Sequence, residues 1–237
     1  MLMSKINFEE YFEIYLFNYP EKTECKTMLG DFLSFLKFHK VALPYKFSFV
    51  SSQASLIPEM SLNQNLLIDF SPNSLTESKE VQFQDFLKLP ENGPLEKLYK
   101  TIELPHMLPE QSDAQMKKVC SLIKALLCEG QFIFLEEPEL DLDTETLSLF
   151  VDALKNHVQT HQVNVFIYSQ NLPMWMAHSQ KMVERMKDFT FLVSPVTTNY
   201  LWDEERERFY APSEKVPSMD NLKFILPEQK NRKNKAA

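Results

Sequence analysis

Glycine is scarce in this chain: its 237 residues include only three, Gly30, Gly93 and Gly130. Loops that bind nucleotide phosphates use glycine because a backbone without side chains lets several N–H groups converge on one phosphate. A chain this poor in glycine can hardly build two such loops. The composition therefore argues against ATP binding before any motif is considered.

Cysteine, basic charge and long apolar runs are also limited. The three cysteines, Cys25, Cys120 and Cys128, show no CxxC spacing, which supports neither a disulfide framework nor a zinc site. We therefore expect no metal cluster and a reducing, cytoplasmic location. The net charge of −8 argues against a nucleic-acid partner, because phosphate binding requires a basic face. With no apolar run of about 18 residues and no signal-peptide pattern at Met1, we expect no direct membrane insertion.

What the chain does have is enough apolar sequence for a sizeable core. Hydrophobic residues make up 44% of it and aromatic residues 12%. This composition and the length of 237 residues suit one large α/β domain, or one domain with a helical insertion.

Residues 132–143 are the most informative stretch. The first four, Phe-Ile-Phe-Leu, indicate a strand that is buried on both faces. Glu136 and Glu137 follow at the expected carboxyl edge of that strand, where open α/β sheets bind ligands and magnesium. After a proline, Asp141 and Asp143 precede a helical pattern and can act as N-cap and first-turn acids.

This stretch resembles the Walker B motif and D-loop of the ATP-binding subunits of ABC transporters, where four apolar residues precede Asp-Glu-Pro and a short Leu-Asp loop. The resemblance places Glu136 at the magnesium-side aspartate and Glu137 at the catalytic general base. The D-loop is matched by Leu140, Asp141, Leu142 and Asp143. The change from Asp to Glu at position 136 falls on a functional position.

The same resemblance extends to a degenerate P-loop. We expect a strand within residues 6–17 and a helix over about residues 28–38, and Lys26 and Thr27 lie between them. They match the last two P-loop residues, where Lys bridges phosphates and Thr holds magnesium. A proline and a cysteine stand where the motif requires glycine, and two glutamates place negative charge where phosphate would lie. We interpret this loop as a relic.

Residues 47–67 resemble the family's Q-loop region. The order is a strand, Gln53, a short apolar segment with proline, and a helix start with an Asn-Leu-Leu ending. In the family this region contacts the coupling helix of a membrane subunit, and the glutamine senses magnesium and nucleotide. Gln53 taken alone would be an ordinary polar loop residue, so the resemblance rests on the whole segment.

The family's helical subdomain corresponds to residues 70–128, within which the signature motif admits two registers. One pairs Ser112 and Gln115 with the signature Ser and Gln, with one extra helix residue. The other is gapless to Glu136 and places Met116-Lys117-Lys118 over the Met-Lys-Lys of lipid-transport (Mla/Mce-like) members. Both registers lack the paired glycines that hold the γ-phosphate of ATP on the opposite subunit.

Beyond residue 143 we expect a helix over residues 144–157. His157 and His161 would form a solvated helix end rather than a metal site, because no acid or cysteine completes the set. A buried strand over residues 163–168 leads to Gln170, which replaces the family's switch histidine. Glutamine can donate a hydrogen bond but cannot carry the charge of an imidazole.

These segments together predict an α/β fold with an ABC-type, P-loop-NTPase-like parallel sheet core and a helical subdomain. One domain is expected over residues 1–226, with a late edge strand at 189–193 and a hairpin at 200–210. The polar, basic tail at 227–237 is expected to be disordered.

Three functions are consistent with this sequence. The first is a non-hydrolysing subunit, peripheral on the cytoplasmic side, that docks on a membrane permease subunit or pairs with an ABC-type partner as a homo- or heterodimer, and needs no cofactor. The second is a divergent active ATPase with ATP and Mg²⁺, in which Lys26 and Thr27 bind phosphate and metal, Glu137 is the base and Gln53 orients water. The third is a soluble regulatory protein without a transporter.

Overall fold

The computed structural model describes residues 8, 10–18, 28–41, 43–71, 78–186 and 190–196, together with the strand backbones at 201–203 and 208–210. The chain divides into two compact units, Met1–Val196 and Thr197–Ala237. In the second unit, β7 (Leu201–Asp203) and β8 (Arg208–Tyr210) pair antiparallel, which confirms the expected hairpin. The domain limit expected at residue 226 stays a prediction, and the tail at 227–237 lies outside the described residues.

The first unit is built on a six-stranded sheet with the order β2-β3-β4-β1-β5-β6. Its strands are β1 (Ile14–Asn18), β2 (Phe47–Val50), β3 (Phe132–Glu136), β4 (Asn164–Tyr168), β5 (Lys181–Arg185) and β6 (Phe191–Pro195). Strands β1 to β5 run parallel, and β6 pairs antiparallel with β5 at one edge. This confirms the predicted α/β class with a mainly parallel core. The late edge strand lies two residues further along than the expected 189–193.

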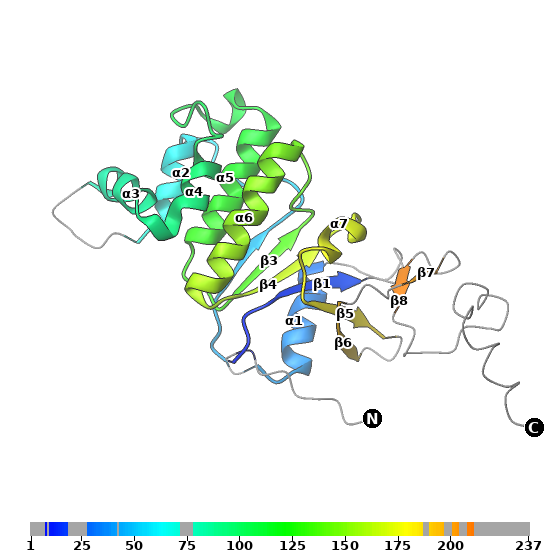
Figure 1. Ribbon diagram of the computed structural model, residues 1–237. Coiled ribbons are helices and arrows are strands. Elements are labelled where there is room, and N and C mark those ends of the chain that lie inside the picture. The colour runs from blue at the N-terminus through cyan, green and yellow to red at the C-terminus, as the bar shows by residue number, and fades with distance from the viewer. Residues whose placement is uncertain are drawn as a thin grey trace, which may run out of the picture. The chain divides into compact units, whose positions relative to one another are not determined.

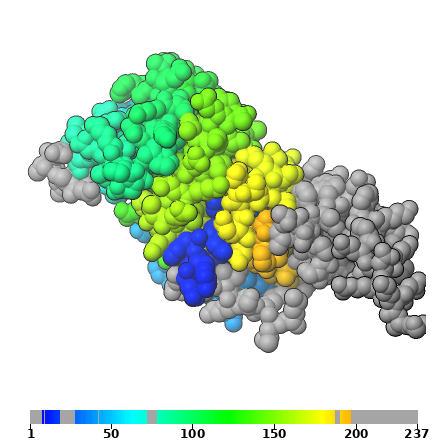
Figure 2. Space-filling view, in the orientation of Figure 1, coloured from blue at the N-terminus to red at the C-terminus, as the bar shows by residue number. Residues whose placement is uncertain are grey.

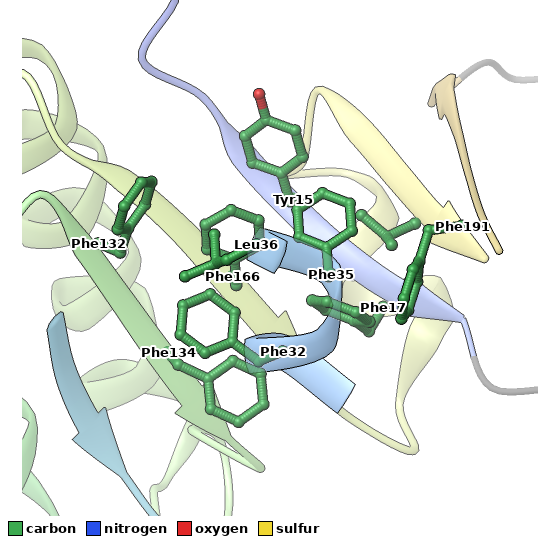
Figure 3. Close-up of a cluster of buried hydrophobic side chains, with 10 residues drawn as sticks. Tyr15, Phe17, Phe32, Phe35, Leu36, Phe132, Phe134, Phe166 and Phe191 are labelled. Atoms are coloured by element: carbon green, nitrogen blue, oxygen red, sulfur yellow. The ribbon is translucent and has the colours of Figure 1, made fainter. Parts of the chain in front are cut away.

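The two faces of the sheet carry different side chains, because residues alternate along each strand. One face is aromatic and is covered by α1 (Met28–Phe38), which contributes Phe32, Phe35 and Leu36. Figure 3 shows these side chains among Phe17, Phe134 and Phe166 of the strands. Phe32 stacks on Phe134 with ring centroids 5.0 Å apart. Burial of each such ring contributes roughly 1.5–3 kcal/mol, which makes this cluster a main part of the core.

The opposite face is aliphatic, with Ile133 and Leu135 of β3 fully buried there. Two connections cross the sheet in opposite directions. One runs from β1 through α1 to β2, and the other runs from β3 through α6 (Thr144–His161) to β4. Since parallel crossovers are right-handed, α6 lies on the face away from α1. Figure 1 shows α6 beside α5 (Ala114–Leu127), and in Figure 2 the residues coloured green form one continuous surface.

Several helices lie between β2 and β3, where the helical subdomain was assigned by resemblance. They are α2 (Leu62–Asp69), α3 (Lys79–Leu87), α4 (Gly93–Tyr99) and α5, with 3-10 turns η1 (Pro90–Asn92) and η2 (Pro109–Gln111). A short helix, α7 (Leu172–Met176), follows β4. None of the described helices is long and apolar enough to cross a membrane.

One local prediction is wrong. Helix α6 runs to His161, so His157 does not lie at a solvated helix end but inside the helix, with 8% of its surface exposed. The reason is its spacing from Phe150 and Leu154, which places all three on one buried face of the helix.

Candidate functional site

The candidate site lies where β2, β3 and β4 end. Because these strands are parallel, their carboxyl ends meet at one edge of the sheet. Glu136 closes β3 and Glu137 follows it, Ser169 and Gln170 follow β4, and Ser51 follows β2. The side chains that the sequence predicted from the Walker B and switch positions are therefore brought to the same edge.

Glu137 is held in a distinct backbone conformation. Its φ of 46° is left-handed, and its N–H donates to the carbonyl oxygen of Tyr168 at 2.7 Å. The N–H of Gln170 donates to both carboxylate oxygens of Glu137, at 3.2 Å each. Position 170 thus contacts Glu137 through its backbone, while the Gln170 side chain is exposed.

The pKa of Glu137 is raised from its ordinary value of 4.5 to about 7. Burial is the main cause, the N–H of Gln170 partly opposes it, and the nearby charges of Glu139 and Glu136 add to it. Near neutral pH both the protonated and the ionised form of this carboxyl are therefore populated. A pKa close to the working pH suits a general base.

Lys118 is the main residue of this region that the sequence did not single out by itself. Its side chain is 0% exposed, and its Nζ donates to the carbonyl oxygens of Ser51 at 3.2 Å and Ser52 at 2.9 Å. Burial lowers the pKa of the Lys118 amine, and four carboxylates oppose that shift: those of Asp141, Glu139, Glu136 and Glu137. The available signal was its spacing from Leu122 and Ala125, which puts a lysine on the buried face of α5.

Glu136 and Glu139 have separate partners. The N–H of Ser52 donates to Oε2 of Glu136 at 3.4 Å, so this carboxylate lies beside the loop after β2. Glu139 accepts hydrogen bonds from the hydroxyl of Ser169 and from Nε1 of the fully buried Trp175, the latter at 2.8 Å. Glu139 therefore fixes the turn after β3 to the end of β4 and to α7. Neither Glu139 nor Trp175 was predicted as part of the site.

The D-loop residues form two turns. The N–H of Leu140 donates to the carbonyl of Glu137, and the N–H of Leu142 donates to the carbonyl of Glu139. Leu140 and Asp141 are exposed, and Asp141 has a left-handed φ of 66°. It therefore lies outside α6, contrary to the expectation that it could belong to the helix start.

Asp143 is the N-cap of α6, as expected. Its Oδ1 accepts from the N–H of Thr146 at 2.7 Å. Its Oδ2 accepts from Nε2 of Gln115 at 3.1 Å, and its own N–H donates to Oε1 of Gln115 at 2.8 Å. The hydrogen bonds that its carboxylate accepts, first from the N–H of Thr146 and then from the side chain of Gln115, lower the pKa of Asp143. The start of α5 is thus joined to the D-loop by a reciprocal pair.

The other predicted signature residues lie elsewhere. The hydroxyl of Ser112 is buried and donates to the carbonyl of Leu108 at 3.0 Å, within its own segment. The N–H of Met116 donates to Oδ1 of Asp113, the N-cap of α5, at 2.7 Å. Gln115 is therefore the predicted signature residue that hydrogen-bonds to the D-loop, and both registers stay open.

The remaining predicted residues make few contacts with this edge. Gln53 has an exposed side chain, and its carbonyl accepts from the hydroxyl of Ser51. Lys26 and Thr27 lie outside the described residues. Within the described ranges, no three His, Cys, Asp or Glu side chains converge closely enough to hold a metal ion.

Solved structures with the same arrangement are found by comparison. The chain is similar to an inward-facing ABC transporter described as of metal-chelate type, with TM-score 0.55 and 16% identity over 82% of this chain and 84% of that one. An ATP-binding subunit of an ABC transporter has TM-score 0.51 and 15% identity over 73% and 74% of the two chains. A dimeric ATP-binding cassette in a post-hydrolysis state bound to ADP and phosphate has TM-score 0.54 and 14% identity over 81% and 88%.

No protein-family model and no curated protein matches the sequence. At identities of 14–16%, the likeness to solved structures establishes the fold. The chain has the fold of the ATP-binding cassettes of ABC transporters.

Proposed function

We propose that this chain is a non-hydrolysing ABC-type subunit that docks on a membrane permease subunit, beside a partner ATPase or a second copy of itself. Its role is structural or coupling, at the cytoplasmic side of the membrane. The observation that carries the proposal is the buried ammonium group of Lys118 among the carboxylates that follow β3. The chain supplies its own cation where bound nucleotide and metal would otherwise balance this charge.

The sequence of the phosphate-binding segments supports the same conclusion. Both candidate phosphate loops lack glycine, and the first also carries two glutamates. Each loss removes N–H donors or adds repulsion where the transferring phosphoryl group needs stabilisation. These losses act on the same transition state, so together they would abolish useful turnover.

Docking is supported by the rigid presentation of the loop after Gln53. The side chain of Asn65 is 0% exposed and binds this loop at several points. Its Oδ1 accepts from the N–H of Ile57 at 2.8 Å, and its Nδ2 donates to the carbonyls of Ile57, Met60 and Ser61 at 3.0–3.1 Å. Because this loop is already ordered, binding of a partner does not cost the conformational entropy of ordering it, and this favours affinity.

Two apolar side chains project from this region. Ile57 is 40% exposed and Leu104 is 51% exposed. The segments that carry them are joined at the start of α2, where Leu62 N–H donates to the carbonyl of Met107 at 2.9 Å and Asn63 N–H donates to that of Pro105 at 2.8 Å. We call Ile57 and Leu104 the docking face. Exposed apolar residues on a rigid support suit an amphipathic helix of a membrane subunit.

Purification of native complexes from membranes tests this function. The tagged wild-type chain is expected to recover an ABC permease, with or without a second ATPase. Ile57→Asp should lose the permease, because it places a charge in the apolar contact. Ile68→Asp changes an equally exposed isoleucine on α2 outside the docking face, and it should keep the complex. Recovery of neither a permease nor an ATPase by the wild type would overturn the proposal.

A second function, a divergent active ATPase, is favoured by one observation. Glu137 has a pKa of about 7 and is oriented by the N–H of Gln170, as a general base requires. Phosphate release that depends on Glu137, and is lost in Glu137→Gln, would establish this function instead. The narrower idea of lipid transport rests only on the similarity of Met116-Lys117-Lys118 to lipid-transport members.

A further inference from the structure

A cavity of about 570 Å³ lies at the far ends of the elements that build the candidate site. Its walls include Leu126 and Leu127 at the end of α5, His157 one turn before the end of α6, and His161 at that end, with Phe70 and Phe86. At 1.5 Å per residue, the helix places His157 roughly 21 Å from Asp143 at the other end of α6. The cavity is therefore separate from the carboxylate edge.

The wall of this cavity contains a buried histidine, and its unpartnered Nε2 has almost no accessible surface, so a ligand reaches this nitrogen when the imidazole ring turns toward the cavity. His157 is 8% exposed, and its Nε2 is buried without a hydrogen-bond partner among the described residues. The ring stacks on that of His161 with centroids 4.4 Å apart. Burial, and secondarily the proximity of His161, lower the pKa of His157 to about 3, so its imidazole is neutral at physiological pH. An unpaired buried polar atom destabilises the fold unless something binds to it.

We propose that this cavity binds a small, uncharged, mainly apolar molecule whose single hydroxyl group hydrogen-bonds to Nε2 of His157. A hydroxyl can donate or accept, so it satisfies this nitrogen in either tautomer of the imidazole. The phenylalanine and leucine side chains of the wall accommodate the apolar part, and the volume is typical of small-molecule sites.

The charges of the lining favour an uncharged ligand. Lys46 and Glu129 contribute one positive and one negative group to the wall, which balance each other. An ionised ligand would lose its hydration next to a neutral imidazole without gaining an opposite charge. A metal ion is not a suitable occupant either, because the described residues offer no set of three ligands for one.

The test uses 4-ethylphenol and ethylbenzene, which differ only in the hydroxyl group, titrated into the full chain by calorimetry. The wild type should bind the phenol about fivefold more tightly, the effect of one ordinary hydrogen bond. His157→Phe keeps a ring of similar size, so it should bind both compounds equally and melt no lower than the wild type without ligand. His106→Phe, at an exposed histidine outside this cavity, should keep the preference for the phenol.

A second readout does not depend on the folding of any variant. The ¹⁵N resonance of His157 Nε2 in the wild type should shift with 4-ethylphenol and not with ethylbenzene. The proposal is overturned by equal affinity of the wild type for both compounds, by a phenol preference that persists in His157→Phe, or by no binding of either compound up to its solubility limit.

Discussion

Lys118 donates to the carbonyl oxygen of Ser52 at 2.9 Å, and the N–H of the same serine donates to Glu136 at 3.4 Å. The loop that leads to Gln53 is therefore held between α5 and the end of β3. Ser52 thus joins the start of the loop that carries Ile57 to the carboxylate edge, without any nucleotide. Through this link, a subunit that does not hydrolyse ATP can still transmit a change at the carboxylate edge to a bound membrane subunit.

Replacing Lys118 should destabilise the fold. Lys118→Met removes the cation among four carboxylates and leaves the carbonyls of Ser51 and Ser52 without their donor. Leaving two carbonyls without their donor costs about 3 kcal/mol, measured here as the free energy of unfolding in urea. Lys117→Met, one position earlier on the same helix, should stay within about 0.5 kcal/mol of the wild type. Equal stability of the two variants would refute the role given to Lys118.

Glu137 should make stability depend on pH. Its pKa is about 7 in the folded state against 4.5 ordinarily, so the folded state holds the proton more tightly. The resulting stability is present below pH 4.5 and is lost as the pH rises through 7. Glu137→Gln should therefore match the wild type near pH 4.5 and exceed it by roughly 1 kcal/mol at pH 8, a value reduced for partial exposure of the carboxyl.

Urea unfolding at several pH values measures this difference. Glu103→Gln changes an exposed glutamate and serves as the control, with no pH-dependent difference from the wild type. A Glu137→Gln variant that is no more stable than the wild type at pH 8 would show that the carboxyl is not desolvated as described.

The pair between Gln115 and Asp143 should protect the D-loop. The N–H of Asp143 donates to Oε1 of Gln115 at 2.8 Å, so Gln115→Ala leaves this amide open to water. Hydrogen exchange at Asp143 is expected to become faster, while exchange in β3 is unchanged. Gln159→Ala, on the exposed face of α6, should leave both unchanged. Unaltered exchange at Asp143 in Gln115→Ala would mean that the pair does not hold the loop.

Asn65 should support both stability and docking. Asn65→Ala removes hydrogen bonds to Ile57, Met60 and Ser61 and leaves buried backbone groups unpaired. The expected loss is about 3 kcal/mol in the free energy of unfolding, together with weaker capture of the permease. Glu59→Ala, exposed in the same loop, should change neither. If Asn65→Ala captured the permease as well as the wild type, a preformed docking face would not be needed.

The central strand and the order of the main elements could be predicted from the sequence because their signals are local. Four apolar residues followed by two acids define the end of β3, and Asp143 before an amphipathic run defines the start of α6. Strand β5 was missed because charged residues at both ends of Lys-Met-Val-Glu-Arg mask a short buried centre. Helix α7 was missed because its five residues are too few for a helical period to be visible.

The contacts that build the site could not be predicted, because they join residues far apart in the chain. Lys118 and Ser52 are separated by 66 positions, and Glu139 and Trp175 by 36. A lysine in a buried helix face indicates only that some acceptor must meet it. Which acceptor it meets depends on how α5 packs against the loop after β2, and that packing is set by the whole core.

Calorimetric titration of the purified chain with ATP and magnesium tests the central claim most directly, with Lys26→Ala as the control. The account predicts no binding up to millimolar ATP for either protein, because both phosphate loops lack glycine and Lys118 already serves as the cation of the acidic edge. Micromolar binding by the wild type that is lost in Lys26→Ala would contradict it and leave the active ATPase as the better account.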